Sequence, residues 1–183
     1  HPVPDVFGLR QAVSGRTAGR RLLATIHREE GIIEMSSSSV QPIVQLYEVP
    51  GNDFTRAGEA SSKVKGILKK LGYDPDAIRR VSIAMYEGEI NMVIHANGGI
   101  ARVEIFPDRV EILLSDQGPG IADVEKAMEE GYSTAPDEVR ALGFGAGMGL
   151  PNMKKCCDEF RIDTAIGKGT DVYMIIRVRG SKS

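Results

Sequence analysis

Two pairs of short runs with alternating apolar residues constrain the fold of this chain more than any other feature of its sequence. The first pair is 100–106 and 110–115, and the second is 160–164 and 171–178. Each pair encloses a short segment containing Pro or Gly, and alternation on both sides of such a segment predicts a β-hairpin. Strands that come as hairpins pair antiparallel, so the sequence lacks the strand–helix alternation of a parallel sheet.

The remaining apolar patterns predict one more strand and several helices. Asp74-Pro75-Asp76 is a strong helix-start signal, and Asn97-Gly98-Gly99 is a stop signal. A strand is expected over 43–49, and helices are expected over 55–71, 76–96, 124–130 and 150–157. This grouping favours an α+β fold, a two-layer α/β sandwich whose mixed, mainly antiparallel sheet carries its helices on one face.

Composition limits the class of protein. The chain has 183 residues, 42% of them apolar and 26% charged, with a net charge of -2. Such a chain can bury one core, and it lacks the basic surplus of a nucleic-acid-binding protein. No apolar run approaches the length of a membrane span, and the adjacent Cys156 and Cys157 suit neither a structural disulfide nor a metal site. We therefore expect a cytoplasmic protein.

The N-terminal segment differs from the rest of the chain. Residues 1–39 carry scattered arginines and a serine run, begin with His1, and include Met35 as a candidate start. We expect this segment to be a flexible arm or an added upstream sequence, and residues 40–180 to form the folded domain.

Three polar residues form a stripe on the long predicted helix. Glu87, Asn91 and His95 are four residues apart, so they point the same way at about 100° per residue. Apolar residues flank them on both sides, which a solvated helix face would not show. Glu89 lies almost half a turn away, and we expect it to be an ordinary surface carboxylate. The stripe can serve chemistry, or it can be a hydrogen-bonded seam that stabilises the core.

Two glycine-rich loops follow in the sequence. The first, Asp116-Gln117-Gly118-Pro119-Gly120, comes directly after a predicted strand, and the second, Gly143–Leu150, comes before a predicted helix. Glycines let a ligand approach the backbone, and a helix start attracts phosphate. Neither loop has the P-loop or dinucleotide-binding pattern. A turn capped by Asp116 and a flexible surface loop are the alternative interpretations.

The order of these pieces resembles the GHKL ATP-binding superfamily over 40–179. Glu87-x-x-x-Asn91 resembles its N box, Asp116–Gly120 its first glycine box, Gly145–Leu150 its second, and Gly169-Thr170 its terminal threonine motif. The stretch 84–95 is similar to the bacterial anti-sigma factor serine kinases. The stretches 116–121 and 145–153 are similar to the switch kinases of stress-response signalling.

The resemblance implies a Bergerat fold that uses ATP and Mg²⁺. Glu87 would be the general base, Asn91 the Mg²⁺ ligand, Asp116 the reader of the adenine amine, and Thr170 a contact to the base through water. The other residues implied to bind nucleotide are His95, Gly118, Gly120, Gly145, Gly147, Gly149 and Leu150. Arg140 stands several residues before the second glycine box, unlike the lid arginine of the anti-sigma kinases.

The implied activity is a serine/threonine protein kinase that phosphorylates a small antagonist protein. A sigma factor is a further implied partner, and a homodimer through the first strand and helix is the implied assembly. Nucleic acid and membrane are not expected as partners. The alternative is a non-catalytic, nucleotide-gated module that sequesters a sigma factor or another protein.

Overall fold

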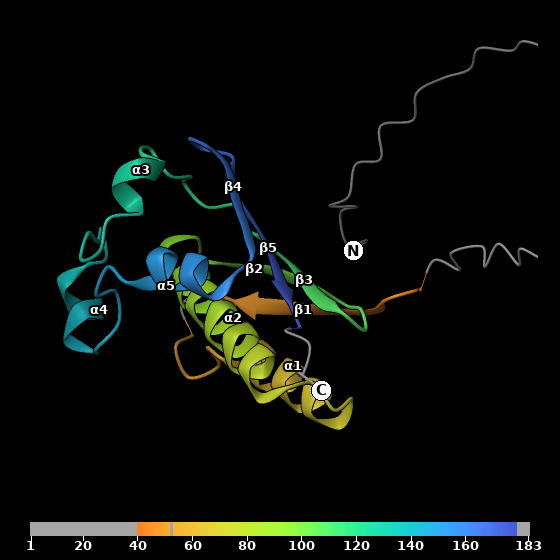
Figure 1. The fold of residues 1–183 in the computed structure, drawn as a ribbon. Coiled ribbons are helices and arrows are strands. Elements are labelled where there is room, and N and C mark those ends of the chain that lie inside the picture. Colours follow the sequence, from red (N-terminus) through yellow and green to blue (C-terminus); the bar gives the residue numbers. More distant parts are fainter. Residues whose placement is uncertain (1–39, 52, 179–183) are drawn as a thin grey trace, which may run out of the picture. The chain divides into compact units, whose positions relative to one another are not determined.

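The computed structural model describes residues 40–51 and 53–178, and these form a five-stranded sheet (Figure 1). The strands are β1 (Ile43–Pro50), β2 (Gly98–Ile105), β3 (Arg109–Ser115), β4 (Glu159–Ala165) and β5 (Gly169–Arg177). Their order is β1-β2-β3-β5-β4. Both predicted hairpins and the predicted first strand are confirmed.

The expected mixed sheet is antiparallel at every pairing among these strands. After β3 the chain makes a long connection and enters the sheet again at its far edge as β4. β4 and β5 form an antiparallel hairpin, and β5 lies between β4 and β3. β5 also pairs antiparallel with β3, so no two neighbouring strands of this sheet are parallel.

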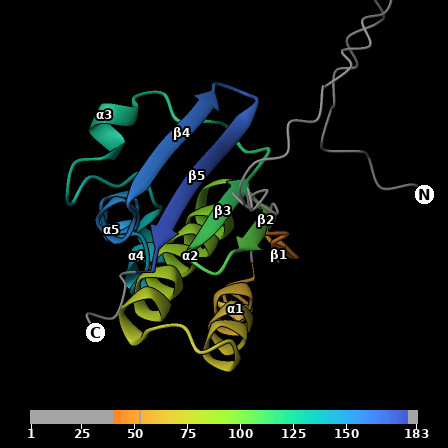
Figure 2. The ribbon, with the colours of Figure 1, turned by 45° about the vertical axis from the view of Figure 1, so that its right-hand side comes forward.

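Three helices cover one face of the sheet (Figure 2). They are α1 (Glu59–Lys70), α2 (Pro75–His95) and α5 (Gly149–Cys156). The shared core consists mainly of alternate strand residues and of apolar residues from these helices, among them Val103, Ile112, Met174, Leu68, Met85 and Met153. The predicted α+β two-layer sandwich is therefore confirmed.

Helix α2 begins and ends where its local signals predict. The Asp74 carboxylate accepts a hydrogen bond from the Ala77 N–H at 2.9 Å and caps the helix start. The helix ends before Asn97, which has a left-handed backbone with a φ of 58°. In the middle of the helix, a Cβ on Gly88 would come within 1.9 Å of a Leu114 methyl. Glycine at this position lets α2 lie close to the sheet.

Helix α1 begins at Glu59, four residues after the predicted start, and Glu89 explains how it begins there. Gly58 precedes the helix and has no side chain to cap it. Instead the Glu89 carboxylate of α2 accepts hydrogen bonds from the N–H groups of Gly58, Ala60 and Ser61 at 2.9, 3.2 and 2.6 Å. Glu89 is only 1% exposed. The prediction of a surface carboxylate was wrong, because Glu89 lies on the face of α2 that packs against α1.

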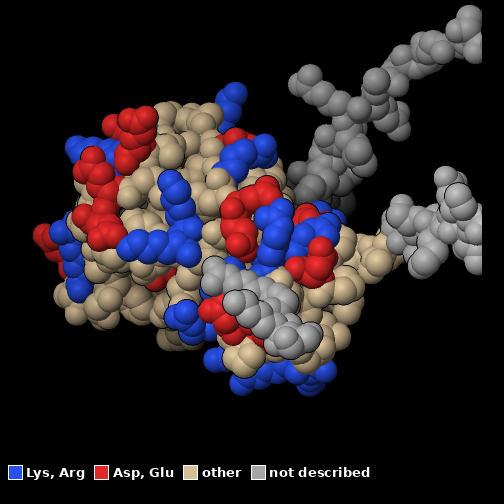
Figure 3. Space-filling view, viewed as in Figure 1, with Lys and Arg blue, Asp and Glu red and all other residues tan. Residues whose placement is uncertain are grey.

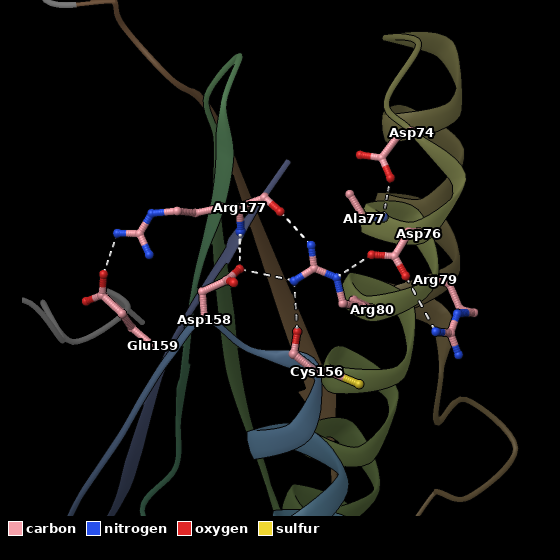
Figure 4. Close-up of polar contacts among 9 residues, drawn as sticks. All are labelled: Asp74, Asp76, Ala77, Arg79, Arg80, Cys156, Asp158, Glu159 and Arg177. Atoms are coloured by element: carbon pink, nitrogen blue, oxygen red, sulfur yellow. Dashed lines mark hydrogen bonds and ion pairs between the residues drawn. The ribbon is translucent and has the colours of Figure 1, made fainter. Parts of the chain in front are cut away.

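A buried arginine ties three elements together at the other end of α2 (Figure 4). Arg80 is 6% exposed and forms ion pairs with Asp76 at 2.9 Å and Asp158 at 3.1 Å. Its guanidinium also donates to the carbonyl oxygens of Cys156 and Arg177. The start of α2, the end of α5 and the end of β5 therefore share one charged side chain.

The connection between β3 and β4 holds, besides α5, two short helices, α3 (Val124–Ala127) and α4 (Asp137–Ala141). The sequence predicts α3 with a longer range, 124–130, and does not predict α4. The predicted segment 1–39 lies outside the described residues. None of the helices in the described ranges is long and apolar enough to cross a membrane.

Candidate functional site

A cavity of about 580 Å³ lies between α2, the ends of β3 and β5, and the glycine-rich connection. Its wall includes every residue singled out from the sequence for binding or catalysis except Gly118. These residues are Glu87, Asn91, His95, Asp116, Gly120, Gly145, Gly147, Gly149, Leu150 and Thr170. Four separate segments of the chain therefore meet in one cavity, whose volume is in the range typical of small-molecule sites.

At one end of the cavity, Asp116 organises the turn after β3. Its Oδ1 accepts hydrogen bonds from the N–H groups of Gly118 at 2.8 Å and Thr170 at 3.2 Å. Among the described residues no hydrogen bond reaches its Oδ2, so this oxygen can accept from a ligand. Burial raises the pKa of Asp116, and the two backbone donors oppose that shift. Gly118 itself lies outside the cavity wall and shapes the turn.

A pair of threonine hydroxyls lies beside Asp116. The Oγ1 atoms of Thr164 and Thr170 are 3.0 Å apart. Thr164 accepts from the Ile121 N–H and donates its single hydroxyl proton to the Gly169 carbonyl. Thr170 must then be the donor of the pair, which leaves its oxygen able to accept from a ligand or water. Sequence reasoning missed Thr164, which the register of the β4–β5 hairpin places opposite Thr170.

At the other end of the cavity, helix α5 presents its N-terminus. No side chain caps this helix, and no acidic residue lies in its first turn. The first backbone N–H groups of a helix have no partner within the helix, so they can bind an anion here. A Cβ on Gly149 would come within 3.0 Å of the Asn91 side-chain oxygen. Glycine at this position therefore lets the helix start lie directly against Asn91.

The polar stripe of α2 forms the floor between these two ends. The Glu87 Oε1 accepts a hydrogen bond from the Asn152 Nδ2 at 2.8 Å, and the Asn91 Nδ2 lies 3.8 Å from the sulfur of Met153. Loss of hydration lowers the pKa of His95, while the nearby Asp116 carboxylate opposes the shift. Sequence reasoning missed Asn152. Its only local signal is a polar residue in the first turn of a helix that follows a glycine box.

Several residues of the segment 123–147, among them Ala127, Tyr132 and Phe144, line the cavity, and we call this segment the lid. Phe144 of this lid stacks on Phe54 of the loop before α1, with ring centroids 5.2 Å apart. Arg140 does not line the cavity, and its guanidinium donates to the Ser133 carbonyl at 2.8 Å within the lid. The lid is therefore held by its own contacts, by this aromatic contact and by an ion pair between Glu130 and Lys155 of α5.

The arrangement suits a ligand with a flat polar ring at one end and an anionic chain at the other. Asp116 and Thr170 offer hydrogen-bond acceptors at the first end, and α5 offers backbone donors at the second. Glu87 places a carboxylate near the anionic end, where it can take a proton from an incoming hydroxyl group.

The chain is similar to proteins of a known family. Residues 52–176 match the family described as the histidine kinase-like ATPase domain. The serine/threonine-protein kinase RsbT of Bacillus subtilis is 34% identical over 115 residues, which cover 61% of this chain and 80% of that protein. The anti-sigma F factor of Pasteuria penetrans is 30% identical over 142 residues, which cover 72% of this chain and 91% of that one.

A solved structure shares the fold. The structure of the RsbU and RsbW domains of a Mycobacterium tuberculosis protein superimposes with a TM-score of 0.52 at 16% identity. The match covers 76% of this chain and 34% of that one. At this level of identity the similarity is one of fold.

Proposed function

The chain belongs to the histidine kinase-like ATPase domain family, and on that premise we propose that it is a serine/threonine protein kinase of the anti-sigma regulatory type. It would transfer the γ-phosphoryl group of ATP to a serine or threonine of a small antagonist protein. The observation that carries this proposal is the meeting of Glu87, Asn91, Asp116, Thr170 and the α5 N-terminus in one cavity. The similarity to RsbT and to the anti-sigma F factors supports it.

Each residue would have one task in the transfer. The Asp116 Oδ2 would accept a hydrogen bond from the adenine amine, and Thr170 would hold the base through water. The N-terminus of α5 would bind the phosphates. Glu87 would take the proton of the acceptor hydroxyl group. The oxygen of that hydroxyl group would bond to the γ-phosphorus while the bond between the γ-phosphorus and the ADP oxygen breaks.

Mg²⁺ fits this site as a companion of the nucleotide. It would neutralise charge on the triphosphate, and Asn91 would supply one oxygen ligand beside the α5 start. A single amide is a weak ligand for Mg²⁺, which prefers six oxygens. We therefore expect the protein to bind Mg²⁺ mainly together with nucleotide.

The surface supports protein partners. Acidic and basic side chains are interspersed over the face in Figure 3, whereas nucleic-acid binding requires clustered Lys and Arg.

The first strand, β1, is an edge strand whose Ile43, Val44 and Leu46 are exposed. We expect this edge to form a homodimer, and a sigma factor to be a further partner. The free Cys156 and Cys157 suit the reducing cytoplasm.

The test combines calorimetry with phosphotransfer. The wild type should bind ADP with Mg²⁺ and, when incubated with γ-labelled ATP and an extract of its own cells, should label one small protein on serine or threonine. Glu87→Gln should keep ADP binding and lose labelling, while Glu159→Gln, an exposed control outside the cavity and the lid, should keep both. No heat of ADP binding would refute the proposal. Binding without labelling by the wild type would favour the nucleotide-gated module.

A further inference from the structure

The first turn of α5 carries a side chain that holds the candidate base. Asn152 is three residues after Gly149, and its Nδ2 donates a 2.8 Å hydrogen bond to the Glu87 Oε1. A carboxylate can only accept, so the amide nitrogen must be the atom that faces it. Both residues are half-buried. This bond therefore fixes which oxygen of Glu87 is occupied.

Neighbouring contacts hold Asn152 in place. The next residue, Met153, is fully buried in the core, and its sulfur lies beside the Asn91 amide. The backbone N–H of Asn152 donates a helical hydrogen bond to the Met148 carbonyl oxygen at 2.9 Å. The position of Asn152 is therefore set by the packing of α5 on α2.

The bond leaves the second oxygen of Glu87 available. No other hydrogen bond to the Glu87 carboxylate is made within residues 40–51 and 53–178, so Oε2 can face an incoming hydroxyl. One turn of α5 spans about 5 Å. The turn that offers backbone donors to an anion at Gly149 therefore also carries the group that orients the carboxylate.

We propose that Asn152 is a positioning residue that holds Glu87 in the orientation for proton transfer and couples this orientation to the phosphate-binding end of α5. The inference rests on the proposed kinase function. It predicts that Asn152 affects the chemical step and leaves nucleotide binding intact. A purely structural link between α5 and α2 would instead change stability and nucleotide affinity together.

The test uses substitutions that differ in whether they can donate a hydrogen bond. Asn152→Asp keeps the shape and cannot donate, Asn152→Leu keeps the volume, and Asn152→Gln keeps a donor. The matched control is Lys154→Ala, which changes an exposed residue of the same helix. For each variant we would measure melting temperature, the Kd for ADP with Mg²⁺, and kcat and KM for transfer to the labelled protein identified with the wild type.

We expect Asn152→Asp and Asn152→Leu to lower kcat by about 10- to 100-fold, the loss typical of a group that orients a functional side chain. The Kd for ADP should stay within about twofold in Asn152→Leu, a difference well below 1 kcal/mol. Asn152→Asp adds a negative charge to the first turn of α5, so its kcat is measured at saturating ATP. Asn152→Gln should recover part of kcat, and Lys154→Ala should match the wild type. In the Glu87→Gln background, Asn152→Leu should leave the residual rate of transfer unchanged, because its effect passes through Glu87.

Two results would overturn the inference. The first is a kcat within twofold of wild type in both Asn152→Asp and Asn152→Leu. The second is a loss of kcat in Asn152→Leu matched by an equal loss of ADP affinity or by a lower melting temperature. If the wild type bound ADP and transferred no phosphate, the proposed function would fail, and this inference with it. If Glu87→Gln abolished transfer and the Asn152 variants did not, only the role of Asn152 would fail.

Discussion

Glu87 and Glu89 lie two positions apart on one helix, and we predict that replacing Glu89 lowers stability whereas replacing Glu87 lowers activity. Glu89→Ala removes a carboxylate that is 1% exposed and that accepts three backbone N–H groups. Two of these donors, on Ala60 and Ser61, belong to buried residues. Glu87→Ala removes a half-buried carboxylate with a single bond, to the Asn152 side chain. The first change should act on folding and the second on chemistry.

The magnitude follows from the donors that are left without a partner. Each buried, unsatisfied N–H costs about 1–3 kcal/mol, so the two buried donors give roughly 2–6 kcal/mol for Glu89→Ala. The Gly58 N–H is half-buried, and water can replace part of its bond. A loss of this size is a large fraction of the roughly 5–15 kcal/mol that stabilises a typical domain. Glu89→Gln keeps one acceptor oxygen and should lose less.

The assay is urea denaturation followed by circular dichroism at neutral pH. With a slope of about 2 kcal/mol per molar urea, the midpoint for Glu89→Ala should fall by about 1–3 M at an unchanged slope. Glu87→Gln should unfold close to wild type. A loss below about 1 kcal/mol for Glu89→Ala would refute the capping role, since even one unsatisfied buried donor costs that much. Equal destabilisation by Glu87→Gln would contradict the separation of the two carboxylates.

Three further predictions concern other parts of the structure. Arg80→Met should destabilise the domain by about 3–5 kcal/mol, because it leaves two carboxylates and two carbonyl groups without this buried cation. Urea denaturation measures the loss, and an unfolding midpoint equal to that of the wild type would contradict the stabilising role of Arg80. Burial raises the pKa of Cys157 to about 12, so Ellman's reagent at pH 8 should react with this thiol at least ~100-fold faster in urea than in the native protein; equal rates would show that the thiol is accessible and ionised. Asp116→Asn should weaken ADP binding by roughly tenfold or more in calorimetry. Because burial raises the pKa of Asp116, wild-type affinity should fall as the pH drops through that raised value, above the usual ~3.9, and this fall should be absent in Asp116→Asn.

Several parts of the fold could be predicted from short stretches of sequence. The ends of α2 follow from the Asp74 cap and the stop at Asn97, and both hairpins follow from alternation around a turn. The stripe of Glu87, Asn91 and His95 follows from helical spacing alone. These features depend on interactions between residues within a few positions of one another, so the local sequence contains them.

Other features depend on how distant segments pack. Glu89 accepts from residues 28–31 positions earlier, and Asn152 donates across 65 positions. Helical spacing grouped Glu87 with Asn91 and placed Glu89 on another face of α2. Spacing within α2 does not show that this face meets the uncapped start of α1. The start of α1 was predicted four residues too early for the same reason, because its cap comes from Glu89 of another helix.

The sequence by itself determined the antiparallel hairpins, every described element except α4 and, apart from Gly118, a set of residues that line the cavity. Only the tertiary structure decided which of two neighbouring glutamates is buried as a cap, which asparagine holds the other, and how Arg80 joins three elements. The physical reason is that caps and turns are made by neighbours in the chain, whereas a buried carboxylate or guanidinium is stabilised by whatever groups packing brings to it.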